Sequence, residues 1–171
     1  MSKAVMLSIR PKWCEKIASG EKTIEVRKTR PKLETPFKCY IYCTLPKYPH
    51  EDFIATDYPR PQFYGGGKVI GEFTCERIAL IAYDGGELSS TTNAAFSPAT
   101  CLTRSEIIAY IGDKGRCYGW HMSNLRIYDT PCELSEFTGL RDMRFGAAPY
   151  DIKRAPQSWC YVEAAKEGEK A

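Results

Sequence analysis

The sequence predicts a β-dominated fold, a compact and strongly curved sheet or small barrel with helical plugs at its ends. Three observations lead to this prediction. Many short segments alternate apolar and polar residues, which is typical of half-buried strands. Only two segments have clear helical spacing. The chain of 171 residues shows no internal repeat and no linker long enough to separate domains, so we expect a single domain over residues 1–164.

The first third of the chain predicts a strand, a helix and two further strands. Residues 4–9 form an apolar run of strand length. Apolar residues then recur at helical spacing over residues 11–19, with proline at the start and Gly20 as the stop. Residues 22–28 and 37–43 alternate in polarity, so each predicts a strand with one face buried.

The middle of the chain alternates between strands and long connections. Residues 44–66 are rich in Pro and Tyr, lack any period and predict a surface excursion that ends in a glycine-rich turn. Residues 68–75 and 77–83 predict two strands, and residues 84–100 predict a turn-rich loop.

The last third begins with a helix and ends with a strand. Thr103 and Glu106 have the spacing of a capping box, which opens a helix that runs through Ile111. We expect strand pieces at 117–121 and 124–128, an irregular stretch at 133–157, a final strand at 158–164 and a flexible tail at 165–171.

The composition is that of an ordinary globular protein, with 43% hydrophobic and 26% charged residues. It excludes a disordered chain, a collagen-like chain and a coiled coil. No apolar stretch reaches the length of a membrane span, and the first residues lack the apolar run of a signal peptide. We therefore expect a cytoplasmic protein without a membrane partner.

Eight cysteines are scattered along the chain without a CxxC pair, and there are only two histidines. This pattern favours reduced thiols that pack as small apolar residues, with a metal site or disulfides as the alternative. We expect no metal and no cofactor.

Positive charge is concentrated at the start of the chain. Residues 1–50 hold 11 Lys/Arg and 4 Asp/Glu, whereas residues 51–171 hold 13 and 17. Two interpretations fit this imbalance: one positive face for an anionic partner such as nucleic acid, or an ordinary solvated surface.

The segment from Gly20 to Arg27, called the motif segment below, carries the most specific pattern. Glu25 and Arg27 share parity on the predicted strand, so both project from one face. Lys22 has the opposite parity and can join them only from the turn before the strand. An arginine beside Glu25 would keep it ionised for hydrogen bonding to a base or for general-base catalysis. The alternative is a surface charge set that contributes little.

The motif segment resembles the GxKxxExR signature of the ASCH family, a branch of the PUA-like superfamily. The order strand, helix, glycine, strand in LSIRPKWCEKIASGEKTIEVRKTRP is similar to that family, as are GKVIGEFTC, YGWHMSNLRIYDTP and PQSWCYVE. The resemblance covers about residues 5–163 and is strongest to short ASCH proteins common in phages and prophages.

The resemblance implies a small PUA-like β-barrel of about six strands, with two or three short helices closing its ends. It also implies a cleft beside the motif that binds RNA or a nucleotide-like ligand, with Gly20, Lys22, Glu25 and Arg27 as the matching residues. Some ASCH relatives are acetylcytidine amidohydrolases or are described as ribonucleases. A threonine acts as the nucleophile of the amidohydrolases, and this chain has Glu25 at that position.

Other candidate residues each have a simpler explanation. Ser8 and Arg10 flank the end of the first strand. Arg10 has two interpretations, a residue that contacts a phosphate or an ordinary surface arginine. Trp120 and His121 could stack a base and shuttle a proton, or simply pack. The remaining pair is Trp159 and Tyr161, which share parity and would line the outside or a cleft.

Three functions of different classes follow. The first is a module that binds RNA, single-stranded nucleic acid or a nucleotide-like small molecule in a basic cleft. The second is a hydrolase of RNA or a modified nucleoside, with Lys22 and Glu25 as catalytic residues and His121 as an acid partner. The third is an adaptor that docks a protein through the 44–66 excursion. Whether the protein is an enzyme stays open at this point.

Overall fold

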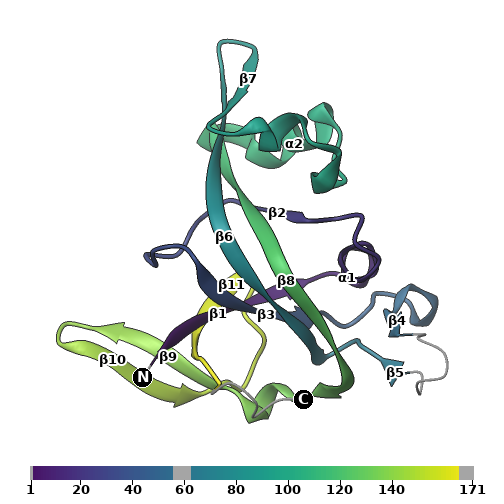
Figure 1. Ribbon diagram of the computed structural model, residues 1–171, viewed down its shortest axis with the longest axis vertical. Helices are drawn as coiled ribbons and strands as arrows, with labels where there is room; N and C mark the ends of the chain where they lie inside the picture. The colour runs from purple at the N-terminus through teal and green to yellow at the C-terminus, as the bar shows by residue number, and fades with distance from the viewer. Residues whose placement is uncertain (1, 56–62, 166–171) are drawn as a thin grey trace. The chain divides into compact units, whose positions relative to one another are not determined.

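The computed structural model describes residues 2–55 and 63–165, which group into two compact units. The first unit comprises Met1–Glu15, Lys38–Phe73 and Leu125–Ala171, and the second comprises Lys16–Phe37 and Thr74–Asn124. Two long strands, β6 (Lys68–Asp84) and β8 (Arg116–Cys132), contribute one part to each unit (Figure 1). No helix in the described part of the chain is long and apolar enough to span a membrane.

The sheet of the first unit is built around β1 (Lys3–Ile9), which is buried along almost its whole length. It pairs in parallel with β3 (Phe37–Cys43) and antiparallel with β11 (Trp159–Glu163). Its strand order is β10-β9-β11-β1-β3-β6-β8, in which β9 is Thr138–Met143 and β10 is Gly146–Asp151. A strand paired on both edges and buried on both faces needs a continuous apolar sequence, as residues 4–7 provide.

The second unit has the strand order β7-β6-β8-β2, in which β2 is Ile24–Arg27 and β7 is Glu87–Ser90. Its core gathers apolar side chains from these strands and from helix α2 (Arg104–Ile111): Ile24, Val26, Ala79, Ile81, Leu88, Ala94, Ala95, Ile107, Ile111 and Cys117. The predicted capping box of α2 is present, because Thr103 and Glu106 bond each other's main-chain N–H groups.

Short elements complete the fold. Helix α1 is Pro11–Ala18, and the two-residue strands β4 (Ile54–Ala55) and β5 (Phe63–Tyr64) pair with each other. The 3₁₀ turns are Pro49–Glu51, Asn93–Phe96, Pro98–Thr100, Gly112–Lys114 and Leu134–Glu136. Residues 56–62 of the predicted 44–66 excursion and residues 166–171 of the predicted tail lie outside the described residues.

The predicted barrel of about six strands needs correction. The main sheet has nine strands in the described residues, and the strand order of neither unit closes on itself there. The sequence prediction split β6 and β8 into shorter pieces, although each is one strand of 17 residues. The number of α-helices agrees with the prediction, since the described chain contains two short ones.

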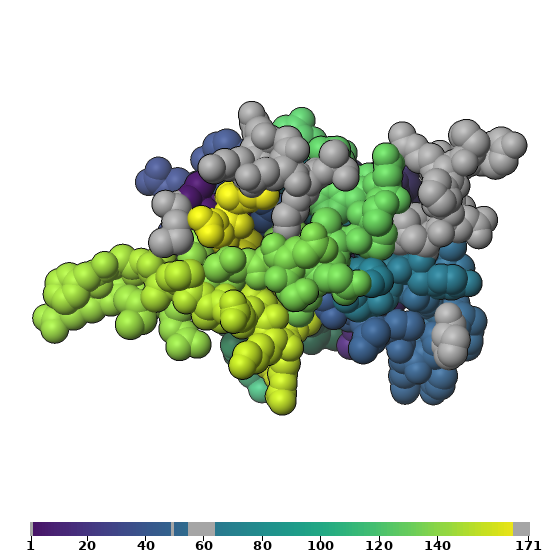
Figure 2. Space-filling view, turned by 90° about the horizontal axis from the view of Figure 1, so that it is seen from below, coloured from purple at the N-terminus to yellow at the C-terminus, as the bar shows by residue number. Residues whose placement is uncertain are grey.

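The stretch 133–157, predicted to be irregular, contains the antiparallel hairpin β9–β10 (Figure 1). The yellow-green atoms at the left of Figure 2 belong to this part of the chain. The sequence of β9 does not alternate clearly between apolar and polar residues, because it contains Gly139, which has no side chain. The ring of Tyr150 on β10 lies against Gly139, and a Cβ there would be 2.3 Å from that ring. Pro149 also argues against a strand by sequence, but β10 ends the strand order, and an edge strand tolerates a proline.

None of the eight cysteines forms a disulfide, and all eight lie in the described residues. Five of them are buried, and burial raises the pKa of Cys75 to about 12 and that of Cys117 to about 11. Thiols with such pKa values stay protonated at neutral pH, which makes them inert packing residues.

Candidate functional site

The motif segment begins where helix α1 ends. Gly20 has a φ of +81°, the left-handed conformation that glycine adopts without strain, and its N–H donates to the Ile17 carbonyl. The N–H of Lys22 then donates to the Lys16 carbonyl, which turns the chain from the helix toward strand β2. Lys22 therefore lies in the turn before the strand, the one place from which it can reach Glu25.

Lys22 is held deep inside the second unit, with only 3% of its surface exposed. Its ammonium donates to the Thr100 carbonyl at 2.6 Å and to the Ile24 carbonyl at 3.0 Å, and it lies 3.5 Å from the Glu25 Oε2. Two carbonyls and one carboxylate of the protein thus surround the Lys22 ammonium and use its hydrogen-bonding capacity.

Glu25 and Arg27 complete what we call the buried triad with Lys22. The Arg27 Nη2 lies 3.1 Å from the Glu25 Oε1, and the two residues are 6% and 8% exposed. The shared parity predicted from the sequence brings them to one face. The surface-charge alternative does not hold, because charges removed from water depend on one another far more than exposed pairs do.

The catalytic interpretation of Glu25 meets a steric obstacle. Its Oε2 is buried and, in the described part of the chain, accepts no hydrogen bond; its neighbour is the Lys22 ammonium. A general base must come within hydrogen-bond reach of the proton that it abstracts. In this geometry neither a water molecule nor a ribose hydroxyl reaches that oxygen.

Strand register separates His121 from the triad. Glu25 is opposite Trp120 and Ile24 is opposite His121 in the antiparallel β2–β8 pair. Since directly opposed residues project from the same face and neighbours alternate, Glu25 and His121 lie on opposite faces. His121 instead lies 3.4 Å from the Thr92 hydroxyl. Burial, with a smaller effect of Arg77, lowers the pKa of His121.

Trp120 faces the same side as Glu25 but is fully buried. Its ring meets Phe37 edge-on, with the centroids 5.9 Å apart. This geometry favours the packing interpretation of Trp120, because a base can stack only on an aromatic face that it reaches.

Four predicted residues belong to the first unit. The Ser8 hydroxyl donates to the Pro156 carbonyl at 2.5 Å, and Arg10 is exposed, with its carbonyl accepting the N–H groups of Trp13 and Cys14. Trp159 and Tyr161 are half-buried and pack edge-on at 5.3 Å. The structure thus brings Gly20, the triad, Trp120 and His121 into one unit and places these four in the other.

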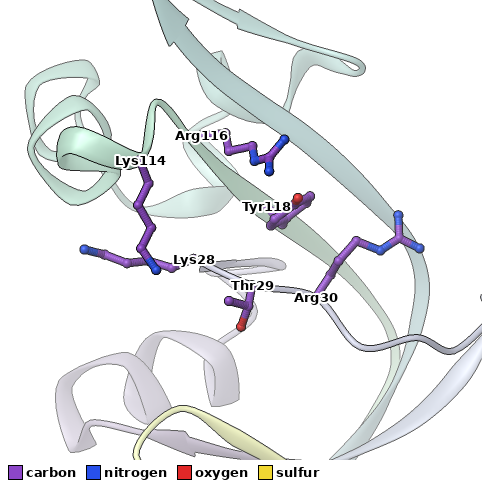
Figure 3. A pocket seen from close by; sticks show the side chains of 6 residues that line it. All are labelled: Lys28, Thr29, Arg30, Lys114, Arg116 and Tyr118. Carbon is purple, nitrogen blue, oxygen red and sulfur yellow. The ribbon is translucent and has the colours of Figure 1, made fainter.

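The second unit also contains a pocket that sequence reasoning did not find. A cavity of about 400 Å³ is lined by Lys28, Thr29, Arg30, Lys114, Arg116 and Tyr118 (Figure 3). We call it the basic pocket. Lys28, Thr29 and Arg30 directly follow β2, Lys114 ends a 3₁₀ turn, and Arg116 and Tyr118 open β8. The sequence does contain a sign of this pocket, because the pattern Lys-x-Arg occurs twice, at 28–30 and at 114–116. These two segments lie far apart in the chain.

Local structure places the basic pocket beside the buried triad. Tyr118 is directly opposite Arg27 in the β2–β8 register, so the two share a face. Gly115, with a φ of +68°, turns the chain from Lys114 into β8. From α2, Tyr110 receives a hydrogen bond from the Lys28 main chain, and the Lys28 ammonium lies 5.3 Å from the ring centroid of Tyr110.

The cations of the basic pocket differ from the lysines and arginines that the protein pairs with its own carboxylates. Lys3, Lys16, Lys38 and Lys68 each pair with a carboxylate, as do Lys22 and Arg27. Within residues 2–55 and 63–165, no carboxylate pairs with Lys28, Arg30, Lys114 or Arg116, and none lines the pocket. Four exposed cations around one cavity create a positive potential that attracts anions.

Solved structures of an ASCH protein from Zymomonas mobilis match this chain. The first has a TM-score of 0.60 at 18% sequence identity and covers 94% of this chain and 87% of the Zymomonas chain. A tyrosine-to-phenylalanine mutant of that protein gives a TM-score of 0.55 at 16% identity, over 95% and 91% of the two chains. The chain therefore has the ASCH fold.

A serine-to-alanine mutant of the Zymomonas protein also matches, with a TM-score of 0.58 at 18% identity, over 94% of this chain and 88% of that one. No protein-family model matches the sequence, and no curated protein matches it. The resemblance predicted from the motif segment is confirmed at the level of the ASCH fold.

Proposed function

We propose that the protein binds RNA or a nucleotide at the basic pocket beside the motif segment. One observation carries this proposal: four cationic side chains line a single cavity without a carboxylate among them. Phosphate contacts from Lys and Arg supply most of the affinity of nucleic-acid binding. Tyr118 adds an aromatic side chain, on which a base can stack.

In this proposal the buried triad has a positioning role. Lys22 and Arg27 are too buried to contact a phosphate, and both are bound to Glu25. The ion pairs fix strand β2, and the chain that leaves it supplies Lys28 and Arg30 to the basic pocket. The motif segment thus acts on the ligand through the residues that follow it.

The geometry favours binding over hydrolysis. The hydrolase hypothesis needs an accessible Glu25 and an acid partner, but Glu25 is enclosed by two cations and His121 projects from the other face. The adaptor hypothesis rests on the 44–66 excursion, part of which lies outside the described residues. Contacts from Ser8, Arg10, Trp159 and Tyr161 stay predictions.

Fluorescence anisotropy with a short labelled single-stranded RNA tests the proposal. We expect salt-dependent binding, and replacing Lys28 or Lys114 with alanine should flatten the dependence of log K on log salt by about 0.7 for each phosphate that the variant no longer neutralises. Lys153→Ala is the matched control, because Lys153 is an exposed lysine of the first unit. Equal slopes for all three variants and the wild type would contradict the proposed site.

A further inference from the structure

The size and the charge of the basic pocket favour one kind of anion. The pocket has a volume of about 400 Å³ and is open to solvent on one side. It is lined by Lys28 and Arg30, which follow β2, by Lys114, which ends the 3₁₀ turn before β8, and by Arg116 at the start of β8. In the view of Figure 3, Lys28 and Lys114 lie on one side, Arg30 lies on the other, and Arg116 and Tyr118 lie between them.

The charges of an extended nucleic-acid strand are too widely spaced to match four cations around one pocket. Neighbouring phosphates of a strand are separated by a whole sugar, and each phosphodiester carries a single charge. The phosphates of a nucleoside di- or triphosphate share bridging oxygens and are therefore packed together. A triphosphate at neutral pH carries about as many negative charges as the pocket has cations, which is the better electrostatic match.

The residues that line the pocket also indicate how this charge would be neutralised. Enzymes that transfer phosphoryl groups commonly hold Mg²⁺ between carboxylates and the phosphates. The six lining residues include no carboxylate, so Lys and Arg must neutralise the phosphates directly. Free Mg²⁺ would then compete with the pocket for the ligand instead of bridging to it.

We propose that the basic pocket binds a nucleotide through a di- or triphosphate group, a specification that rests on the proposed function. The four cations hold the phosphates, and the Tyr118 ring carries the base. Two sources supply this chemistry: a free nucleoside polyphosphate, or the 5′ end of an RNA that has a di- or triphosphate.

Isothermal titration calorimetry of the full chain tests whether the phosphates determine binding. The ligands are adenosine and guanosine and their mono-, di- and triphosphates. We expect affinity to rise at least tenfold from the monophosphate to the triphosphate, with no measurable binding of the nucleoside. Mg²⁺ in excess should weaken triphosphate binding. Arg116→Ala should lower triphosphate affinity about tenfold, whereas Arg154→Ala, an exposed arginine in the first unit, should leave it unchanged.

Two RNAs of one sequence, with a 5′-triphosphate or a 5′-hydroxyl, distinguish the sources. Preference for the 5′-triphosphate RNA over the free nucleotide assigns the site to RNA ends, and the reverse order assigns it to free nucleotides. Tight binding of the 5′-hydroxyl RNA without competition by triphosphate would overturn this inference but leave the proposed function standing. If no RNA and no nucleotide binds, the proposed function fails as well.

Discussion

Replacing Glu25 with alanine is expected to lower the free energy of unfolding by about 3–5 kcal/mol. The substitution leaves Lys22 and Arg27 buried without their shared carboxylate. Removing one partner of a buried ion pair is costly, because the remaining charges keep their desolvation penalty and lose their compensation. Urea denaturation followed by circular dichroism measures the change.

Glu21 provides a matched control three residues before the start of β2. It pairs with Lys16 at 2.7 Å, but this pair is exposed, and we expect Glu21→Ala to leave the unfolding midpoint unchanged within error. Glu25→Gln keeps the side-chain shape and removes only the charge, so it should also destabilise the protein. Equal midpoints for Glu25→Ala and Glu21→Ala would refute the account of a buried triad.

Reversing two charges of the basic pocket is expected to reduce affinity for RNA or nucleotide at least 100-fold. In the double variant Arg30→Glu/Arg116→Glu, two of the four pocket cations become anions, which cancels the positive potential at the cavity. Both side chains are exposed, so the free energy of unfolding should change little. Anisotropy with labelled RNA and calorimetry with triphosphate both measure the reduction.

The double variant Lys153→Glu/Arg154→Glu controls for total charge. It changes the net charge of the chain by the same amount, but at exposed residues of the first unit. We expect affinity to fall at most a few-fold, because long-range attraction weakens. A reduction as large as that of the pocket variant would mean that net charge, and not the basic pocket, determines binding.

Local rules predicted the elements whose residues follow one period. Strand β3 has the predicted bounds 37–43, because its alternation is uninterrupted. Helix α2 was predicted from the Thr103–Glu106 capping box, a signal that depends on four residues only. In contrast, the hairpin β9–β10 was missed, since Gly139 and Pro149 are poor strand residues that only the packing of Tyr150 and an edge position make acceptable.

The candidate site was predictable only where it depends on alternation along a single strand. Parity along one strand placed Glu25 and Arg27 on a common face, and it required Lys22 to lie in the turn. Parity gives no information on burial depth, so the sequence could not distinguish a buried triad from a surface charge set. It also cannot show that residues 28–30 and 114–118 converge, because their proximity depends on the register between β2 and β8.

Charge counting along the sequence located the positive surface incompletely. The excess of Lys and Arg in residues 1–50 supplies Lys28 and Arg30 to the basic pocket. Lys114 and Arg116 come from the part of the chain in which acidic residues outnumber basic ones. A positive site therefore arises from the fold, which brings together the cations of two segments and excludes carboxylates from between them.

Chemical-shift mapping of the full ¹⁵N-labelled chain with adenosine triphosphate tests the central claim most directly, because it locates the ligand without a substitution. The account predicts that the largest amide shifts fall at residues 28–30 and 114–118, with saturation on titration. Largest shifts in the first unit, for example along β9 and β10, with residues 28–30 and 114–118 unchanged, would contradict it.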